Sequence, residues 1–274
     1  MGFRIMGVIN VTPDSFSDGG AFLDPQAAIA QGERLALEGA DILDVGGEST
    51  RPGADPVSAA DEIERVLGVV EGLAGAGPQI SIDTSKASVA EAAVDAGATY
   101  VNDVTAFRGD PDLAAFVADR GLDCCLMHML GDPRTMQVDP RYDDVVDDVK
   151  AFLAERVAYA VGQGVAEDRI MLDPGIGFGK TVDHNLELLR RIDEIVALGR
   201  PVVIGTSRKS FLGRITGREA GERVHGTAAT NVLALARGAT VFRVHDVAEA
   251  RDALLVAAAT LAGRWPPTTS STTT

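Results

Sequence analysis

Short apolar runs that each end in a polar residue recur along this chain at intervals of about 30 residues, the spacing of a strand followed by a crossover helix. Most are nearly continuous in Val, Ile, Leu and Met, as strands covered on both faces should be. A chain of 274 residues that is 46% hydrophobic is long enough for one large core. The eight predicted strands are 5–10, 42–46, 80–84, 100–104, 124–129, 170–174, 202–207 and 241–246.

Segments rich in Ala, Leu and Glu lie between these strands, and several precede a Gly suited to ending a helix. Eight strand and helix alternations predict a single α/β domain, a (β/α)8 TIM barrel over residues 1–264, with a frayed Ser/Thr tail over 265–274. An open doubly wound sheet is the alternative, but it would usually carry a glycine-rich phosphate loop after its first strand. The predicted helices are 25–38, 58–73, 88–96, 112–120, 142–162, 185–198, 226–237 and 248–262.

The formal charge of −15 argues against nucleic acid and acidic membrane surfaces as partners, and favours a small-molecule pocket with its own cluster of cations. The only two cysteines, Cys124 and Cys125, are adjacent, which suits neither a disulfide nor a metal knuckle. No secretory signal pattern and no membrane-spanning apolar run is present. We therefore expect a cytoplasmic location.

The polar residues stand where a barrel enzyme places its chemistry. Catalytic groups of such barrels lie at the carboxyl ends of strands, because those ends converge on one open face. A single Asp at such a position more often caps the next helix. Polar groups arriving from nearly every strand favour a concave site instead. They are Asn10, Asp44 with Glu48, Asp83, Asn102 with Asp103, His128, Asp173, Ser207 with Lys209, and Arg243 with His245.

The run 174–181 is close to a nucleotide-binding P-loop, but its first position holds Pro174, which lacks the donor and the backbone freedom of a phosphate cradle. It also fails the dinucleotide pattern, because Lys180 occupies the place of the third glycine. We interpret its glycines as leaving room for a flat ligand beside the backbone.

The sequence resembles dihydropteroate synthase, a pterin-binding enzyme of folate synthesis, from Ile5 to about Leu261. That resemblance implies the barrel independently of the strand count. It also implies a transferase that condenses 6-hydroxymethyl-7,8-dihydropterin pyrophosphate with p-aminobenzoate, giving 7,8-dihydropteroate and pyrophosphate, with Mg²⁺ as cofactor. The matching motifs are 6–20, 44–53, 81–84, 102–103, 126–129, 172–180, 207–209 and 243–246.

The resemblance implies a role for each motif residue. Among them Asp173 is the predicted anchor, because a buried carboxylate facing two ligand donors makes charge-assisted hydrogen bonds. The implied pterin site comprises Asp83, Asn102, Met127, Asp173, Phe178, Gly205 and Lys209. The implied pyrophosphate site comprises Asn10, Arg51, Arg243 and His245, with Asn10 as the Mg²⁺ contact. The implied p-aminobenzoate site comprises Phe16, Thr50, Pro52, Ser207 and Lys209.

The implied catalytic groups are Asp83, Asp173, Lys209, Arg243 and His245. Arg243 and His245 alternate on the eighth strand, which predicts that both side chains lie on one face. The loops 11–20 and 47–56, dense in Gly, Pro, Ser and Asp, are predicted to be lids that exclude water. His128 is assigned either to the pterin floor or to a structural hydrogen bond.

Two other readings are open. Pterin-binding methyltransferase barrels share the Asp, Asn and Asp constellation, although the motifs at 207–209 and 243–245 argue against them. An inactive pterin-binding barrel would need no pyrophosphate pocket such as Asn10, Arg51, Lys209, Arg243 and His245 suggest. The resemblance further implies a homodimer through the later helices, and a sulfonamide target whose sensitivity depends on the fit around Phe16, Pro52 and Lys209.

Overall fold

A computed structural model describes residues 2–12, 25–50 and 53–264. Its eight strands are all parallel and are hydrogen-bonded in the order β6-β5-β4-β3-β2-β1-β8-β7. A parallel bridge between Leu172 and Val202 brings the two edges together. The predicted (β/α)8 TIM barrel is confirmed. The strands are β1 (Arg4–Asn10), β2 (Ile42–Gly46), β3 (Gln79–Asp83), β4 (Tyr100–Asp103), β5 (Asp123–Met127), β6 (Ile170–Asp173), β7 (Val203–Ile204) and β8 (Val241–Val244).

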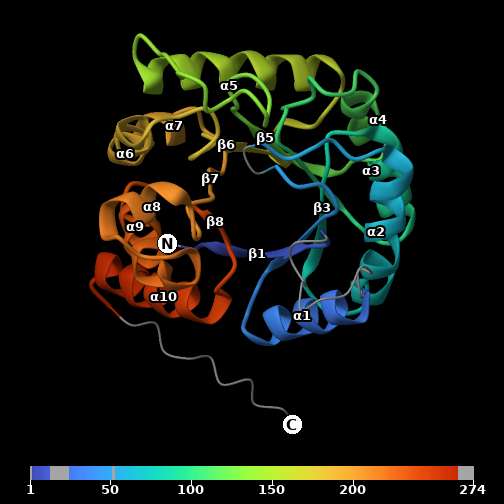
Figure 1. The fold of residues 1–274 in the computed structure, drawn as a ribbon, viewed down its shortest axis with the longest axis horizontal. Coiled ribbons are helices and arrows are strands. Elements are labelled where there is room, and N and C mark those ends of the chain that lie inside the picture. The colour runs from blue at the N-terminus through green and yellow to red at the C-terminus, as the bar shows by residue number, and fades with distance from the viewer. Residues whose placement is uncertain (1, 13–24, 51–52, 265–274) are drawn as a thin grey trace.

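Helices form a ring outside the strands (Figure 1). Those that follow β1, β2 and β3 pack against one another in sequence, as do the last two helices of the chain. The α-helices are α1 (Pro25–Leu37), α2 (Ala59–Leu73), α3 (Ala87–Asp95), α4 (Leu113–Asp119), α5 (Val145–Gly162), α6 (Val182–Arg190), α7 (Ile192–Val196), α8 (Ser210–Thr216), α9 (Val224–Ala236) and α10 (Val247–Ala262).

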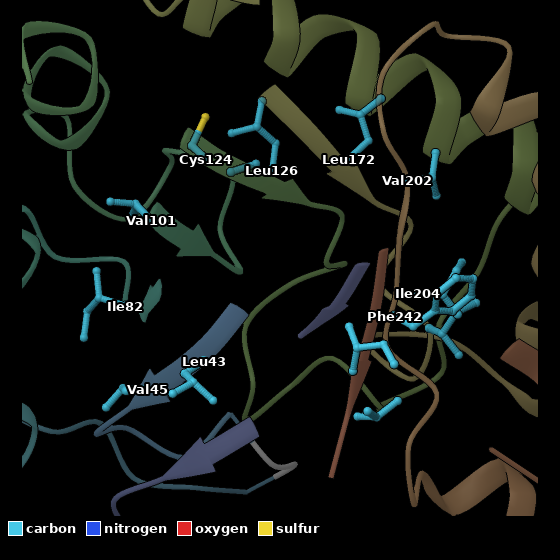
Figure 2. Close-up of a cluster of buried hydrophobic side chains, with 14 of the residues drawn as sticks. Leu43, Val45, Ile82, Val101, Cys124, Leu126, Leu172, Val202, Ile204 and Phe242 are labelled. Atoms are coloured by element: carbon cyan, nitrogen blue, oxygen red, sulfur yellow. The ribbon is translucent and has the colours of Figure 1, made fainter. Parts of the chain in front are cut away.

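Two separate buried clusters divide the side chains of the strands. One cluster joins strand residues to the helices around them, and Figure 2 shows strand members of it, among them Leu43, Ile82 and Leu126. The other cluster fills the barrel interior. It consists of Met6, Ile42, Tyr100, Cys125, Met171, Val203 and Val241.

The alternation of strand residues also fixes where the polar groups lie. Residues two apart on a strand share a face. Two positions nearer the carboxyl end than an apolar interior residue, the same face therefore carries a second layer. That layer contains Asp44 after Ile42, Asn102 after Tyr100, Met127 after Cys125, Asp173 after Met171, Gly205 after Val203 and Arg243 after Val241.

The prediction of one helix over 185–198 is wrong. The helix starts earlier, at Val182, where the Thr181 hydroxyl accepts the His184 N–H at 3.1 Å. It breaks at Arg191, whose φ of −114° and ψ of 28° are not helical, and α7 begins after it. The Arg191 guanidinium there binds carboxylates of both α6 and α7, so side-chain ion pairs accompany the break.

Helix α8 was not predicted, because it is only seven residues long and follows directly on the motif 207–209. Strands β7 and β8 end earlier than predicted, at Ile204 and Val244. As a result Ser207 and His245 lie in the loops beyond their strands. No helix in the described parts of the chain has both the length and the apolarity needed to cross a membrane.

Candidate active site

The carboxyl ends of adjacent strands bring the predicted residues side by side. Asn10 pairs in register with Gly46, Gly46 with Asp83, and Asp83 with Asn102. On the other side of the barrel Met127 pairs with Asp173. The strand register thus lines up the predicted pterin and pyrophosphate residues along one rim.

Asp44 is the centre of one group of polar side chains at this rim. It is fully buried, and its carboxylate accepts hydrogen bonds from the Ser81 hydroxyl at 2.6 Å and from the Asn102 amide at 3.1 Å. Its Oδ2 also accepts the Arg243 Nε–H at 2.6 Å. We call Asp44, Asp83, Asn102 and Arg243 the strand cluster.

Arg243 joins two carboxylates of the strand cluster. While Nε binds Asp44, Nη2 donates to Asp83 Oδ2 at 2.7 Å. Burial opposes the charge of Arg243, but the carboxylates of Asp44 and Asp83 raise its pKa. Burial raises the pKa of Asp83 to about 7, against the lowering effect of the Arg243 charge. The cation predicted for pyrophosphate is therefore held by a carboxylate predicted for pterin.

The role of Asp44 was missed by the sequence analysis, which noted it only as a polar strand end. A usable signal was present, because Asp44 stands in the middle of the strand predicted over 42–46, and the structure buries every residue of that strand. A carboxylate at such a position needs several hydrogen-bond donors to offset its desolvation. Those donors come from three other strands.

Asp173 and Lys209 form the second group, on the opposite side of the barrel mouth. The Asp173 carboxylate accepts the Gly175 N–H at 2.6 Å. Its other oxygen lies 3.9 Å from the position that a Cβ on Gly205 would occupy, so Gly205 leaves space beside it. Burial raises the pKa of Asp173, and Lys209 opposes that shift.

Lys209 reaches the loop after β6. Its ammonium donates to the Ile176 carbonyl and lies 4.2 Å from the centre of the Phe178 ring. Burial lowers the pKa of Lys209 to about 8, while the charge of Asp173 opposes this. Residues 174–180, which we call the glycine turn, therefore contact a predicted catalytic cation directly.

The two groups belong to one electrostatic environment. The charge of Arg243 influences the pKa of Asp173, and the charges of Arg243 and Asp83 influence that of Lys209. Two carboxylates and two cations that are widely separated in sequence are therefore close enough to influence one another's charge.

Ser207 and His245 lie together beyond β7 and β8. The Ser207 hydroxyl accepts the His245 backbone N–H at 3.1 Å and lies 3.0 Å from its Nδ1. Because β8 ends at Val244, His245 does not continue the strand alternation that Arg243 follows. Its ring lies beside Ser207, whereas Arg243 binds Asp44 and Asp83.

Some of the other predicted site residues lie in the part of the chain that the structure describes, and some lie outside it. Met127 is buried, and Phe178 packs against the small cluster that it forms with Met129 and Met136. Asn10 and Thr50 are partly exposed. Phe16, Arg51 and Pro52 lie outside the described residues, as do the tail 265–274 and most of the first predicted lid.

A surface hollow lies outside this rim and contains none of the predicted site residues. It is lined by Pro140, Arg141, Tyr142, Asp143, Asp148 and His184 and is open to solvent. We place the site at the strand ends, because that region combines buried carboxylates with buried cations.

Comparison with known proteins agrees with this geometry. The model of the family described as pterin binding enzyme matches residues 6–245. The dihydropteroate synthase of Neisseria meningitidis serogroup B is 49% identical over 261 residues, covering 92% of this chain and 91% of that protein. The chain belongs to the dihydropteroate synthase family of pterin-binding enzymes. Members of this family are transferases, and we assign the chain to that class.

Two solved structures of the family are closely similar to this fold. The Xanthomonas albilineans dihydropteroate synthase with 4-aminobenzoic acid superposes with a TM-score of 0.90 at 48% identity, covering 95% of this chain and 94% of that one. The same organism's enzyme in complex with 7,8-dihydropteroate gives a TM-score of 0.86 at 45% identity, with the same coverage of each chain. The barrel is thus that of the dihydropteroate synthase family.

Proposed function

We propose that this chain is a dihydropteroate synthase of folate synthesis that condenses 6-hydroxymethyl-7,8-dihydropterin pyrophosphate with p-aminobenzoate. The observation that carries the proposal is that the Asp83–Arg243 pair and Asp173 lie at the carboxyl ends of strands of one barrel, with Lys209 in the loop after β7. The similar Xanthomonas albilineans structures hold 4-aminobenzoic acid in one case and 7,8-dihydropteroate in another, which supports the same substrate classes here.

The pterin presents an amino group and ring N–H groups as donors, and a carbonyl and ring nitrogens as acceptors. Asp173, Asp83 and the Asn102 amide supply acceptors for the donor edge. Lys209 supplies N–H donors for the carbonyl and ring nitrogen. Met127, Phe178 and Gly205 border the flat ring. Each charge-assisted hydrogen bond of this kind contributes about 1.5–3 kcal/mol.

The diphosphate is assigned to Arg243, His245 and Arg51, and negative charge that develops on the leaving group is met by their cations. Departure of the diphosphate leaves positive charge on the pterin methylene carbon, which the ring delocalises and the carboxylates of Asp83 and Asp173 stabilise. The arylamine then attacks that carbon, and no nucleophilic side chain is required. Phe16, Thr50, Pro52, Ser207 and Lys209 are assigned to p-aminobenzoate.

The donor set at Asn10 fits Mg²⁺. One partly exposed amide at the end of β1 offers a single neutral oxygen, which suits an ion that takes its remaining ligands from a diphosphate and water. When bound, Mg²⁺ would neutralise part of the leaving-group charge. Among the described residues no group of three acidic, His or Cys side chains forms a separate metal site.

We further propose that the protein acts in the cytoplasm as a homodimer and is a sulfonamide target. Cys124 and Cys125 are free thiols, which suits a reducing compartment. Helices α9 and α10 pack together and expose Leu233, Val256 and Leu261, each more than half accessible. Light scattering of the purified protein tests the dimer.

The test of the proposed activity is a pyrophosphate-release assay with and without p-aminobenzoate. We expect release that depends on the pterin pyrophosphate, on p-aminobenzoate and on Mg²⁺. Binding of pterin without any release would instead favour an inactive pterin-binding barrel. Methyl transfer from methyltetrahydrofolate would favour the methyltransferase alternative.

A further inference from the structure

Side chains from distant parts of the chain hold the backbone carbonyls of the glycine turn. The Gly177 carbonyl accepts Gln137 Nε2 at 2.6 Å, and the Gly179 carbonyl accepts the Tyr142 hydroxyl at 2.7 Å. The Ile176 carbonyl accepts Lys209, as described above. The turn is therefore positioned by side chains rather than by a strand ladder or a helix.

The Phe178 carbonyl completes this set and is held by Lys180, whose Nζ lies 3.0 Å away. Lys180 is 3% exposed, so its amine is removed from solvent. Its second partner is the Nδ1 of His128 at 2.9 Å. No ion pair to Lys180 is found in the parts of the chain that the structure describes, which is unusual for a buried lysine.

His128 links Lys180 to the end of β6. Its backbone N–H donates to the Asp173 carbonyl at 3.0 Å, and its ring makes an edge contact with Phe152 at 4.8 Å between centroids. A Cβ on Gly175 would lie 1.8 Å from the His128 carbonyl oxygen, so only glycine lets the turn pass here. Burial and the nearby Lys180 charge lower the pKa of His128 to about 2, and a neutral ring leaves Nδ1 free to accept.

From Lys180 the contacts continue to Lys209. The Phe178 N–H donates to the Gly175 carbonyl at 3.0 Å, which closes the turn and fixes the Phe178 backbone. The Phe178 ring then lies under the Lys209 ammonium at 4.2 Å. A displacement of the Phe178 carbonyl would move both this ring and the neighbouring Ile176 carbonyl, which are two contacts of Lys209.

We infer that Lys180 and His128 are positioning residues, which hold the glycine turn so that Lys209 faces the substrate ring. This inference rests on the proposed function, because it takes Lys209 as a pterin contact. Lys180 acts through Phe178 and touches no substrate itself. Burial lowers the pKa of Lys180 well below its usual value, so a charged amine at this position costs stability, and a methionine would fill similar space without that cost. The Lys180 amine therefore positions the glycine turn and does not stabilise the fold.

The experiment compares Lys180→Met with Lys150→Met. Lys150 is a partly exposed lysine of α5 whose surface ion pairs contribute little, so it is the matched control. Two readouts are needed. Steady-state kinetics gives KM for each substrate, and hydrogen–deuterium exchange follows peptides that span 174–180.

For Lys180→Met we expect KM for the pterin pyrophosphate to rise about tenfold, the effect of one misplaced hydrogen bond to a charged group. KM for p-aminobenzoate should rise as well, because Lys209 is assigned to both substrates. Exchange in the turn should become faster, above all at the Gly177 N–H, which donates to Asn185 Oδ1 at 2.7 Å. Lys150→Met should match the wild type in both readouts.

His128 provides a conservative rescue, and it carries the test should Lys180→Met fail to fold. In His128→Asn the amide oxygen replaces Nδ1 as the acceptor, whereas His128→Leu removes the acceptor. We expect the Asn variant to stay close to the wild type and the Leu variant to reproduce the KM and exchange changes of Lys180→Met.

Unchanged KM for the pterin pyrophosphate or unchanged exchange in Lys180→Met overturns the inference. The exchange measurement needs no substrate and is informative by itself. A wild-type protein that releases no pyrophosphate therefore refutes the proposed function while the exchange measurement still tests the role of Lys180 in the turn.

Discussion

The strand cluster and the glycine turn hold their functional groups in different ways. In the strand cluster, charged side chains bind one another directly, with Arg243 between the carboxylates of Asp44 and Asp83. In the glycine turn, neutral backbone carbonyls accept side-chain donors, and Asp173 binds the Gly175 backbone N–H. Substitutions in the strand cluster should therefore reduce both activity and stability. Substitutions around the glycine turn should reduce activity with little effect on stability.

The physical reason is what remains in the structure when one of two interacting groups is removed by a substitution. Removing one member of a buried ion pair leaves an uncompensated charge, which costs about 3–5 kcal/mol. Removing a side chain that faces the ligand space leaves only a turn with one fewer hydrogen bond, which costs about 1 kcal/mol. Four substitutions or conditions test this contrast, taken from the largest expected effect on activity to the smallest.

Asp173→Asn tests the region around the glycine turn. We expect pterin pyrophosphate binding to weaken about 100-fold, because charge-assisted hydrogen bonds to the ligand are lost, with little change in thermal stability. Calorimetric titration and a melting curve measure the two quantities. Equal affinities of variant and wild type would remove Asp173 from the site.

Arg243→Ala tests the strand cluster. We expect turnover to fall at least tenfold, a loss of about 1.4 kcal/mol of transition-state stabilisation. Stability should fall as well, by about 3 kcal/mol, because Asp44 stays buried without its cation. Kinetics and denaturant unfolding measure both. Lost turnover at unchanged stability would show that the strand cluster is not the coupled unit described here.

The pH dependence of kcat/KM should report one group from each region, Asp83 of the strand cluster and Lys209 beside the glycine turn. Asp83 has to be ionised and Lys209 protonated, so activity should rise as the pH increases through about 7 and fall above about 8. Lys209→Arg should move the alkaline limb upward, because a guanidinium keeps its proton. Since Arg243 lowers the pKa of Asp83, Arg243→Ala should move the acid limb to higher pH. A profile with neither limb contradicts both assignments.

Ser81→Ala is the mildest change to the strand cluster. It removes the 2.6 Å hydrogen bond to Asp44 but leaves the Asn102 and Arg243 contacts in place. We expect a loss of about 1 kcal/mol in the free energy of unfolding and less than about threefold in turnover. A larger loss of activity than in Arg243→Ala would show that Ser81, rather than Arg243, organises Asp44.

Much of the architecture could be predicted from the sequence because its signals are local. Strand spacing and continuous apolar runs predicted all eight strands, with β2 confirmed to the residue. Failures came where side chains override local preference. The helix break at Arg191 accompanies ion pairs, and the short β7 ends before Thr206, whose hydroxyl binds Thr230 and Asn231.

The sequence by itself determined which residues reach the barrel mouth, because strand residues alternate between two faces. Asp44, Asn102, Asp173 and Arg243 each lie two residues after an interior residue and so share its face. Only the tertiary structure decided which of them bind one another. Arg243 is 199 residues from Asp44 and 160 from Asp83, so no local pattern encodes those pairs. Closure of the barrel creates them, because desolvation at its mouth favours the pairing of Arg243 with carboxylates on other strands.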